Sequence, residues 1–153
     1  MRKAFTLIEL MVTIAIIGIL TSIATVSYSN VQLRGRDARR KSDLSTIKIN
    51  LATYYASQTP PQYVASTTDA TPGLITINGT TDALSAALSP SYIREMPVDP
   101  TNTGNYVYEY QSFITNGLQK DFNLSATLEN TNDESGWGGG NSWVTFGYVV
   151  HND

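Results

Sequence analysis

The residue of this sequence best placed to do chemistry is Glu9. It is the one ionisable side chain in an apolar run from Phe5 to Val26, and two basic residues, Arg2 and Lys3, precede that run. A carboxylate inside hydrocarbon costs several kcal/mol unless a cation pairs with it or a proton neutralises it. We therefore expect Glu9 to have a partner and a function.

Two further groups of residues have side chains suited to binding or catalysis. His151, the one histidine, lies near the end of the chain, and we expect it in a tail. Asn132, Asp133 and Glu134 cluster oxygen ligands of the kind that calcium prefers, although their spacing fits no EF-hand, so calcium is the one candidate cofactor. The sequence contains no cysteine, no zinc motif and no phosphate-binding glycine loop, and it predicts neither a disulfide nor an enzyme.

Charge is distributed unevenly along the chain. The stretch from Arg34 to Lys41 holds five basic residues and one acidic residue, which are Arg34, Arg36, Arg39, Arg40, Lys41 and Asp37. After Lys41, three basic residues stand against eleven acidic ones, a net charge of −8. Such an acidic region is not expected to bind nucleic acid. We expect the basic stretch to be a solvated helix face, or to contact anionic lipid or the acidic heads of neighbouring subunits.

The apolar run from Phe5 to Val26 is long enough to cross a membrane. Its 22 residues span about 33 Å as a helix. One interpretation is a secretory signal, for which Ser22-Ile23-Ala24 has the pattern of a cleavage site. Another is a plain anchor for an extracytoplasmic binding module, with Arg2 and Lys3 on the cytoplasmic side. Neither interpretation gives Glu9 a role.

A third interpretation rests on a resemblance. The basic leader, Ala4 and the run Phe5-Thr6-Leu7-Ile8-Glu9-Leu10-Met11 closely resemble the amino terminus of type IV pilins, a family that includes the pseudopilins of type II secretion. The resemblance implies that a membrane peptidase cuts between Ala4 and Phe5 and that the new amine of Phe5 is methylated. Ala4 replaces the glycine usual before the cut, so we expect slower processing. Val26 replaces a proline of many members, so we expect no kink there.

The resemblance also gives Glu9 a role in assembly. Cleavage frees an amine at Phe5, one helical turn away, and in a filament the amine of one subunit can neutralise the carboxylate of its neighbour. A mispaired subunit would leave a buried charge, at a cost on the order of 3–5 kcal/mol. Glu9 is then expected to control register and entry into the filament.

Partners and location follow from the same resemblance. The partners are other copies of the chain and other pilins, a prepilin peptidase and methyltransferase, an assembly platform with its ATPase, and membrane lipid before assembly. The precursor is expected to cross the cytoplasmic membrane once, and the product to lie in an extracellular pilus or a periplasmic pseudopilus.

One long helix is predicted from about Phe5 to Gln58. No proline interrupts it, and its second half is amphipathic, because the apolar residues Leu44, Ile47, Leu51 and Tyr54 recur at spacings of three and four. Two pairs of opposite charge at a spacing of four, Asp37–Lys41 and Arg39–Asp43, are typical of a solvated helix surface.

The rest of the chain is predicted to form a small head. Thr81 or Asp82 is suited to cap a short helix that ends by Leu88, before Pro90. Three strands are predicted at about Tyr106–Phe113, Phe122–Glu129 and Trp143–Val150. Asn116-Gly117 marks a turn between the first two, and in the second strand the apolar residues fall on even positions. The helix face is the expected partner of this antiparallel sheet.

The predicted fold is therefore α+β and pilin-like, with a long amino-terminal helix packed on an antiparallel sheet of about three strands. The predicted parts are a leader (1–4), a membrane or filament-core half-helix (5–30), an amphipathic half-helix (31–58) and a head (59–153). The predicted function is a structural subunit of a type IV pilus. The alternatives are a pseudopilin of a secretion or competence system and, in another class, a membrane-anchored binding module.

Overall fold

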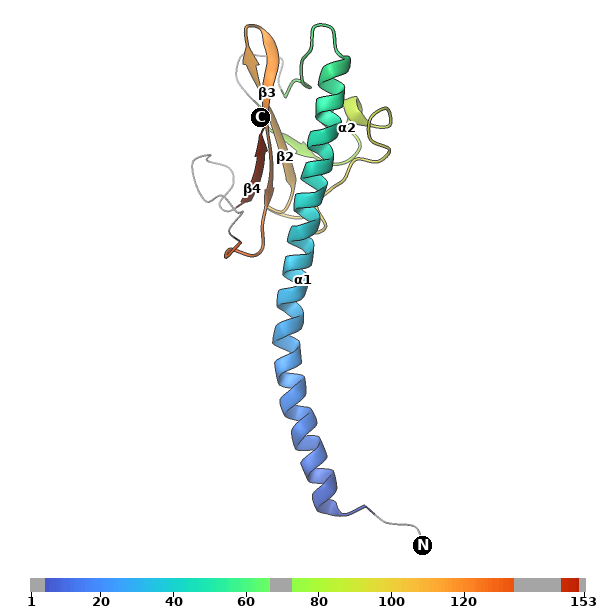
Figure 1. The fold of residues 1–153 in the computed structure, drawn as a ribbon, viewed down its shortest axis with the longest axis vertical. Helices are drawn as coiled ribbons and strands as arrows, with labels where there is room; N and C mark the ends of the chain where they lie inside the picture. The colour runs from blue at the N-terminus through green and yellow to red at the C-terminus, as the bar shows by residue number, and fades with distance from the viewer. Residues whose placement is uncertain (1–4, 67–72, 134–146, 152–153) are drawn as a thin grey trace. The chain divides into compact units, whose positions relative to one another are not determined.

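A computed structural model describes residues 5–66, 73–133 and 147–151, with the backbone alone for residues 24–27 and 151. It divides into two units, Met1–Gly35 and Arg36–Asp153. The elements, in chain order, are α1 (Leu7–Ser57), β1 (Ile75–Ile77), α2 (Ala83–Leu88), β2 (Tyr108–Thr115), β3 (Leu118–Thr127) and β4 (Gly147–His151) (Figure 1).

The long helix is confirmed, and its two halves differ in environment. α1 covers all but the last residues at each end of the predicted Phe5–Gln58 range. In the first unit the large apolar side chains described between Phe5 and Ile23 are all more than half exposed. In the second unit Leu44, Ile47 and Leu51 are completely buried. The change follows from the sequence, which is apolar all round before residue 24 and apolar on one face after residue 43.

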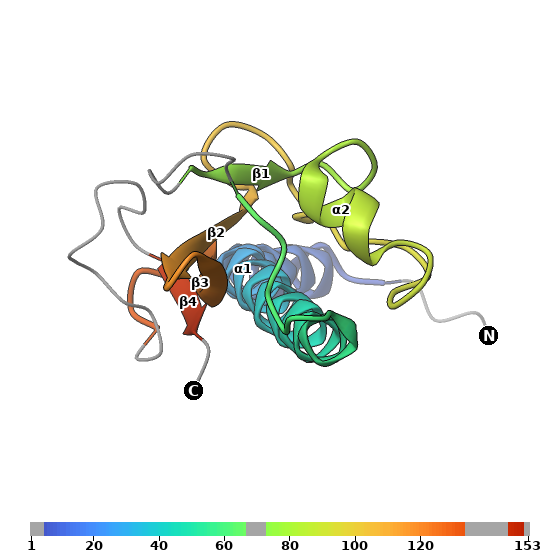
Figure 2. The ribbon, with the colours of Figure 1, turned by 90° about the horizontal axis from the view of Figure 1, so that it is seen from above.

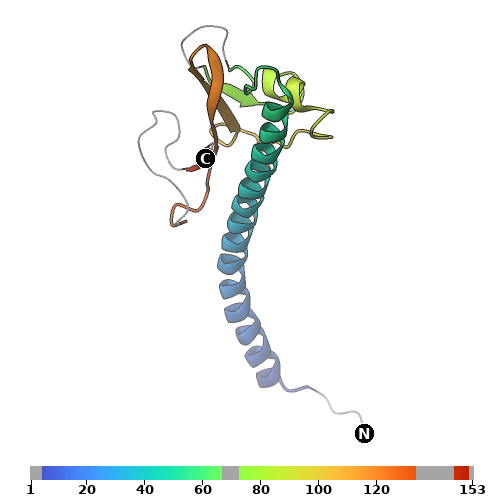
Figure 3. The ribbon, with the colours of Figure 1, turned by 45° about the horizontal axis from the view of Figure 1, so that its top comes forward.

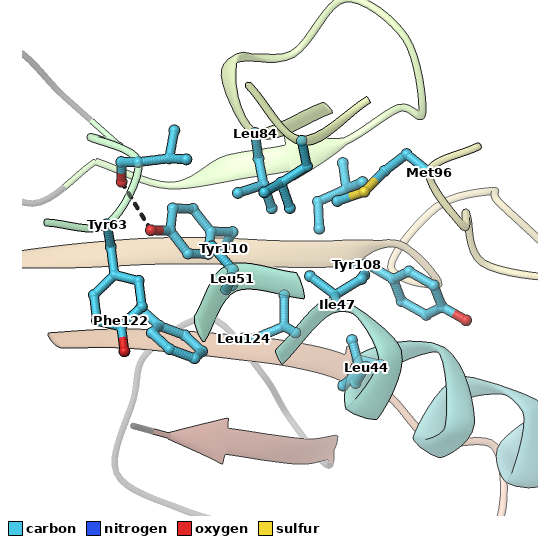
Figure 4. Packing of buried hydrophobic residues seen from close by; sticks show 14 residues of the cluster. Leu44, Ile47, Leu51, Tyr63, Leu84, Met96, Tyr108, Tyr110, Phe122 and Leu124 are labelled. Carbon is cyan, nitrogen blue, oxygen red and sulfur yellow. Dashed lines mark hydrogen bonds between the residues drawn. The ribbon is translucent and has the colours of Figure 1, made fainter. Parts of the chain in front are cut away.

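The core of the second unit lies between the buried face of α1 and the sheet. Tyr108 and Tyr110 of β2 and Leu124 of β3 are completely buried against this face (Figure 4). The hydroxyl of Tyr110 donates a hydrogen bond of 2.8 Å to the carbonyl oxygen of Val64, so the polar end of this ring is satisfied inside the core. Burial raises the pKa of Tyr110, which keeps the hydroxyl protonated as a donor.

The sheet is antiparallel with strand order β1-β2-β3-β4, one strand more than expected (Figure 2). β1 pairs Thr76 with Glu109 of β2. At the other edge β4 pairs Val150 with Leu124 of β3 (Figure 3). β1 has three residues, too few for an alternating pattern to be recognised in the sequence.

The β2–β3 hairpin has the turn and the face that the sequence predicts. Asn116 and Gly117 both have positive φ, 54° and 79°, as the central residues of a type I′ turn do. The even-numbered residues Phe122, Leu124 and Ala126 are buried. This alternation puts one face of β3 on the core.

The short helix α2 is also confirmed, with Asp82 as its cap. The Oδ1 atom of Asp82 accepts a hydrogen bond of 2.8 Å from the backbone N–H of Ser85. Leu84 and Leu88 are completely buried in the core, and α2 lies beside β1 (Figure 2). The cap and the two leucines together explain why six residues hold a helical turn here.

One expectation about the carboxyl terminus is wrong, and another lies partly outside the described residues. β4 is described from Gly147 to His151, and residues 143–146 of the predicted strand Trp143–Val150 lie outside the described residues. His151 is not in a tail, because it belongs to β4 and pairs with Asn123. The second strand also ends earlier than expected, at Thr127, and Glu129 follows it in a loop.

The turn before α2 is closely packed around Gly79, and a substitution there tests this packing. The φ of Gly79 is +85°, and an added Cβ would lie 2.8 Å from the Cγ1 atom of Val98. Gly79→Ala is expected to lower the free energy of unfolding by about 2–3 kcal/mol, because a strained backbone and a steric clash add. Chemical denaturation of the full chain in detergent measures this change.

Gly104→Ala is the matched control. Gly104 also has positive φ, +59°, but nothing lies within 4 Å of an added Cβ. The control should lose only about 1 kcal/mol, from backbone strain alone. Equal losses in the two variants would contradict the proposed clash with Val98.

Candidate functional site

The first candidate site is the start of α1, where Glu9 closes a capping box. Its Oε2 atom accepts hydrogen bonds from the backbone N–H of Thr6 at 2.9 Å and from the hydroxyl of Thr6 at 2.7 Å. The backbone N–H of Glu9 donates in return to the Thr6 hydroxyl at 3.3 Å. This reciprocal pattern satisfies donors at the helix start, where a negative charge is also favourable.

The other carboxylate oxygen of Glu9, Oε1, has no hydrogen bond among the residues that the structure describes. An ammonium group from outside the chain therefore has an acceptor there. Phe5, which precedes Thr6, is 81% exposed. Ala4 lies outside the described residues, so the structure does not test the expected cleavage between Ala4 and Phe5.

The same part of α1 presents an uncovered apolar surface. It contains an 18-residue window with mean hydropathy 2.3, none of which is buried within the chain. By length and composition this helix can cross a membrane. An apolar surface of this extent marks contact with lipid or with other proteins.

The second candidate site is a cluster of charged side chains around Arg40, which is completely buried. The Arg40 guanidinium donates hydrogen bonds of 2.6 and 3.0 Å to the two carboxylate oxygens of Asp99. Its Nη1 atom lies 2.8 Å from Asp37 and 2.7 Å from Glu129. The planar guanidinium therefore joins three carboxylates from separate parts of the chain.

Three neighbours of Arg40 on α1 complete the cluster. Arg36 binds both carboxylate oxygens of Glu129, and Lys41 binds Asp133 at 2.7 Å. The Asp37 carboxylate accepts hydrogen bonds of 3.0 and 2.8 Å from the backbone N–H groups of Glu129 and Asn130. We call the following residues the Arg40 cluster: Arg36, Asp37, Arg40, Lys41, Asp99, Glu129 and Asp133.

These contacts correct the expected role of three of the five basic residues, whereas Arg34 and Arg39 are exposed as expected. Arg36, Arg40 and Lys41 bind carboxylates of their own chain, so they are not a solvated face free for lipid or neighbouring subunits. The expected pair Asp37–Lys41 is also wrong, because Asp37 turns inward to Arg40. The expected pair Arg39–Asp43 is present, at 3.6 Å.

The electrostatics of the cluster hold the carboxylates of Glu129 and Asp99 in the charged form. The hydrogen bonds from Arg36, with those from Arg40, lower the pKa of Glu129 to about 2, against the smaller opposing effect of burial. Burial opposes the charge of Asp99, but the hydrogen bonds from Arg40 and from the backbone outweigh it and lower the pKa of Asp99. Burial likewise opposes the charge of Arg40, and its carboxylate partners outweigh burial and raise the pKa of Arg40.

The expected calcium ligands do not form a site in the described residues. Asn132 is exposed, Asp133 is bound by the ammonium group of Lys41, and Glu134 lies outside the described residues. No group of three or more acidic or histidine side chains among the described residues is arranged to hold a metal ion. Lys41 occupies the position next to Asp133 that a cation would need.

Sequence reasoning missed Thr6 and the Arg40 cluster. The signal for Thr6 was present, because Thr6-x-x-Glu9 before an apolar run is the capping-box pattern. The cluster had no local signal, because Asp99 and Glu129 lie 59 and 89 residues beyond Arg40.

Acid is expected to weaken the second unit through Glu129. A carboxylate whose pKa is lowered on folding stabilises the fold above its ordinary pKa of 4.5, and this contribution is lost as the pH falls toward about 2. Glu129→Gln should cost about 2 kcal/mol at pH 7 and should flatten the pH dependence of unfolding between pH 4.5 and 2. Denaturant titrations of both proteins over that range measure the effect.

Glu95→Gln is the control, because Glu95 is exposed and outside the cluster. It should reproduce the wild-type stability and pH profile. A Glu129→Gln variant whose profile runs parallel to that of the wild type would contradict the assigned ion pairs.

Comparisons with known proteins found similarity at the amino terminus and over most of the chain. Residues 1–25 match the model of the prokaryotic N-terminal methylation motif. The chain is similar to two type IV major fimbrial proteins FimA of Dichelobacter nodosus, at 31% identity over 133 residues (84% of this chain, 78% of the relative) and 29% over 134 residues (84% and 76%). It is 47% identical over 47 residues to a fimbrial protein of Pseudomonas aeruginosa, covering 31% of this chain and 30% of the relative.

A search of solved structures found no significant match. The similarity to the FimA proteins extends over most of both chains, well beyond the amino-terminal motif. By this similarity the chain belongs to the type IV pilin family of structural, non-enzymatic fimbrial proteins.

Proposed function

We propose that the chain is made as a membrane-inserted precursor, cut between Ala4 and Phe5, methylated at Phe5 and polymerised through α1 into a type IV pilus. The uncovered apolar surface of α1 between Phe5 and Ile23 carries the proposal, because its own chain leaves it exposed. Lipid covers such a surface in the precursor, and helices of other copies cover it in the polymer.

The machinery of this pathway is proposed from family membership. A prepilin peptidase and methyltransferase process the amino terminus, and an assembly platform with an ATPase extracts the subunit from the cytoplasmic membrane. Other copies of the chain, with other pilins, form the extracellular fibre. The names of the relatives, major fimbrial proteins, favour a pilus subunit over a pseudopilin of a secretion system.

Glu9 is proposed to pair with the methylated amine of Phe5 of a neighbouring subunit. Its Oε2 atom is held by Thr6, and its Oε1 atom is left as an acceptor among the described residues. An amine and a carboxylate that meet between apolar helices neutralise each other, whereas either one alone is strongly destabilising. The pairing therefore selects subunits in the correct register.

The predicted processing is tested by the mass of the mature protein. The amino-terminal peptide should begin at Phe5 and carry a methyl group, because the motif covers residues 1–25. An Ala4→Gly variant should be processed at least as fast, since glycine is usual before the cut. A mature chain that begins at Thr25, or one that keeps Met1, would contradict the pathway.

The assembly role of Glu9 is tested by Glu9→Ala. The variant should be cut and methylated as the wild type is, yet its incorporation into filaments should fall at least about tenfold, because the neighbouring amine is left without its partner. Sheared filaments and membrane fractions, quantified by immunoblot, give the ratio.

Thr13→Ala is the control for this experiment. Thr13 lies one helical turn beyond Glu9, and its hydroxyl donates to the carbonyl oxygen of Leu10 at 2.8 Å. Its loss should leave incorporation unchanged. Wild-type incorporation of Glu9→Ala would refute the pairing, and failure of the wild type to leave the membrane would favour an anchored binding module.

A further inference from the structure

The loop after β3, residues 129–133, is attached to α1 by polar contacts. Leu128 is the last buried apolar residue before it, and the five loop residues are exposed or half-buried. Arg36, Arg40 and Lys41 of α1 donate hydrogen bonds to carboxylates of the loop, and Asp37 accepts hydrogen bonds from its backbone N–H groups. The buried apolar residues of β3 are thus followed in the chain by a loop that ionic contacts attach to α1.

Arg40 joins this loop to a second one. The Asp99 carboxylate that it binds also accepts hydrogen bonds of 2.8 and 3.3 Å from the backbone N–H groups of Thr101 and Asn102, and Arg40 itself donates to the hydroxyl of Thr101 at 3.1 Å. One side chain, fully buried, therefore fixes two loops, one that precedes β2 and one that follows β3. The ring of Tyr106 lies 5.0 Å from the guanidinium and covers it.

These ion pairs determine the positions of the loops more than they add to the net stability of the fold. A buried ion pair gains little over a well-packed apolar substitute, but loss of one partner leaves buried charges without compensation. A guanidinium is always charged and holds its donors in a rigid plane, so its carboxylate partners can occupy only a few positions. Arg40 therefore specifies where the loops sit.

We propose that Arg40 is the positioning residue for the carboxyl-terminal part of the head, an internal cation that closes loops 99–102 and 129–133 onto α1. The chain contains no cysteine, and the Asp133 carboxylate is already bound by Lys41, so neither a disulfide nor a calcium ion is needed for this closure. The assignment holds for the single chain and does not rest on polymerisation.

Hydrogen exchange, followed by mass spectrometry on the full chain in detergent, tests the proposal. In Arg40→Met the amides of residues 129–133 should exchange at least about tenfold faster, because Asp37 and Glu129 lose their shared cation. The amides of residues 44–51, in the core, should change less than about threefold. The matched control is Arg39→Met, whose side chain is 62% exposed one position earlier, and it should leave both regions unchanged.

Arg40→Lys covers the case in which Arg40→Met fails to fold. It keeps the charge and loses the rigid plane of donors, so the loop should still exchange faster while the core does not. Unchanged exchange in residues 129–133 would overturn the proposal, and so would equal acceleration in loop and core, which would show a role in general stability alone. Calcium chelation should leave wild-type exchange unaltered, and acceleration by the chelator would also overturn the proposal.

Discussion

An apolar helix surface that its own chain leaves uncovered is the constraint on which this protein depends. The large apolar side chains between Phe5 and Ile23 are exposed in the single chain, and water is a poor solvent for them. The capping box with Thr6 holds the charged carboxylate of Glu9 at the amino-terminal end of this surface. Membrane insertion and assembly with other helices are the two ways to bury such a surface, and the proposed function uses them in sequence.

The second half of α1 differs from the first half because residues of its own chain bury one of its faces. Its apolar face packs on the sheet through Leu44, Ile47 and Leu51. One turn earlier, Arg40 binds Asp37 of the same helix and the carboxylates of Asp99 and Glu129, which two loops bring to it. Hydrophobic burial drives the packing, and the ion pairs set the positions of the loops. The head is therefore fixed to α1 independently of what covers the first half of that helix.

Local patterns in the sequence predicted local structure well. The spacing of Leu44, Ile47 and Leu51 identified the buried face of α1, and the even positions of β3 identified its core face. Thr81 and Asp82 were the two candidate caps of α2, and Asp82 is the cap in the structure. Features built from distant residues were not predictable, because nothing near Arg40 indicates that Asp99 and Glu129 reach it. The spacing of Asp37 and Lys41 is that of an ion pair on a helix surface, and nothing in the sequence distinguishes this pair from the buried pair of Asp37 with Arg40. Only the fold shows that Asp37 is buried.

The most direct test of the account asks whether the surface between Phe5 and Ile23 is buried in the fibre. The natural chain has no cysteine, so a single thiol can report on one position. Ile16→Cys, at a position 52% exposed in the single chain, should react with a polar thiol reagent in detergent-solubilised monomer and resist it in intact filaments. Asn105→Cys, on an exposed turn of the head, serves as the comparison. Equal reactivity of the two thiols in intact filaments would contradict the account.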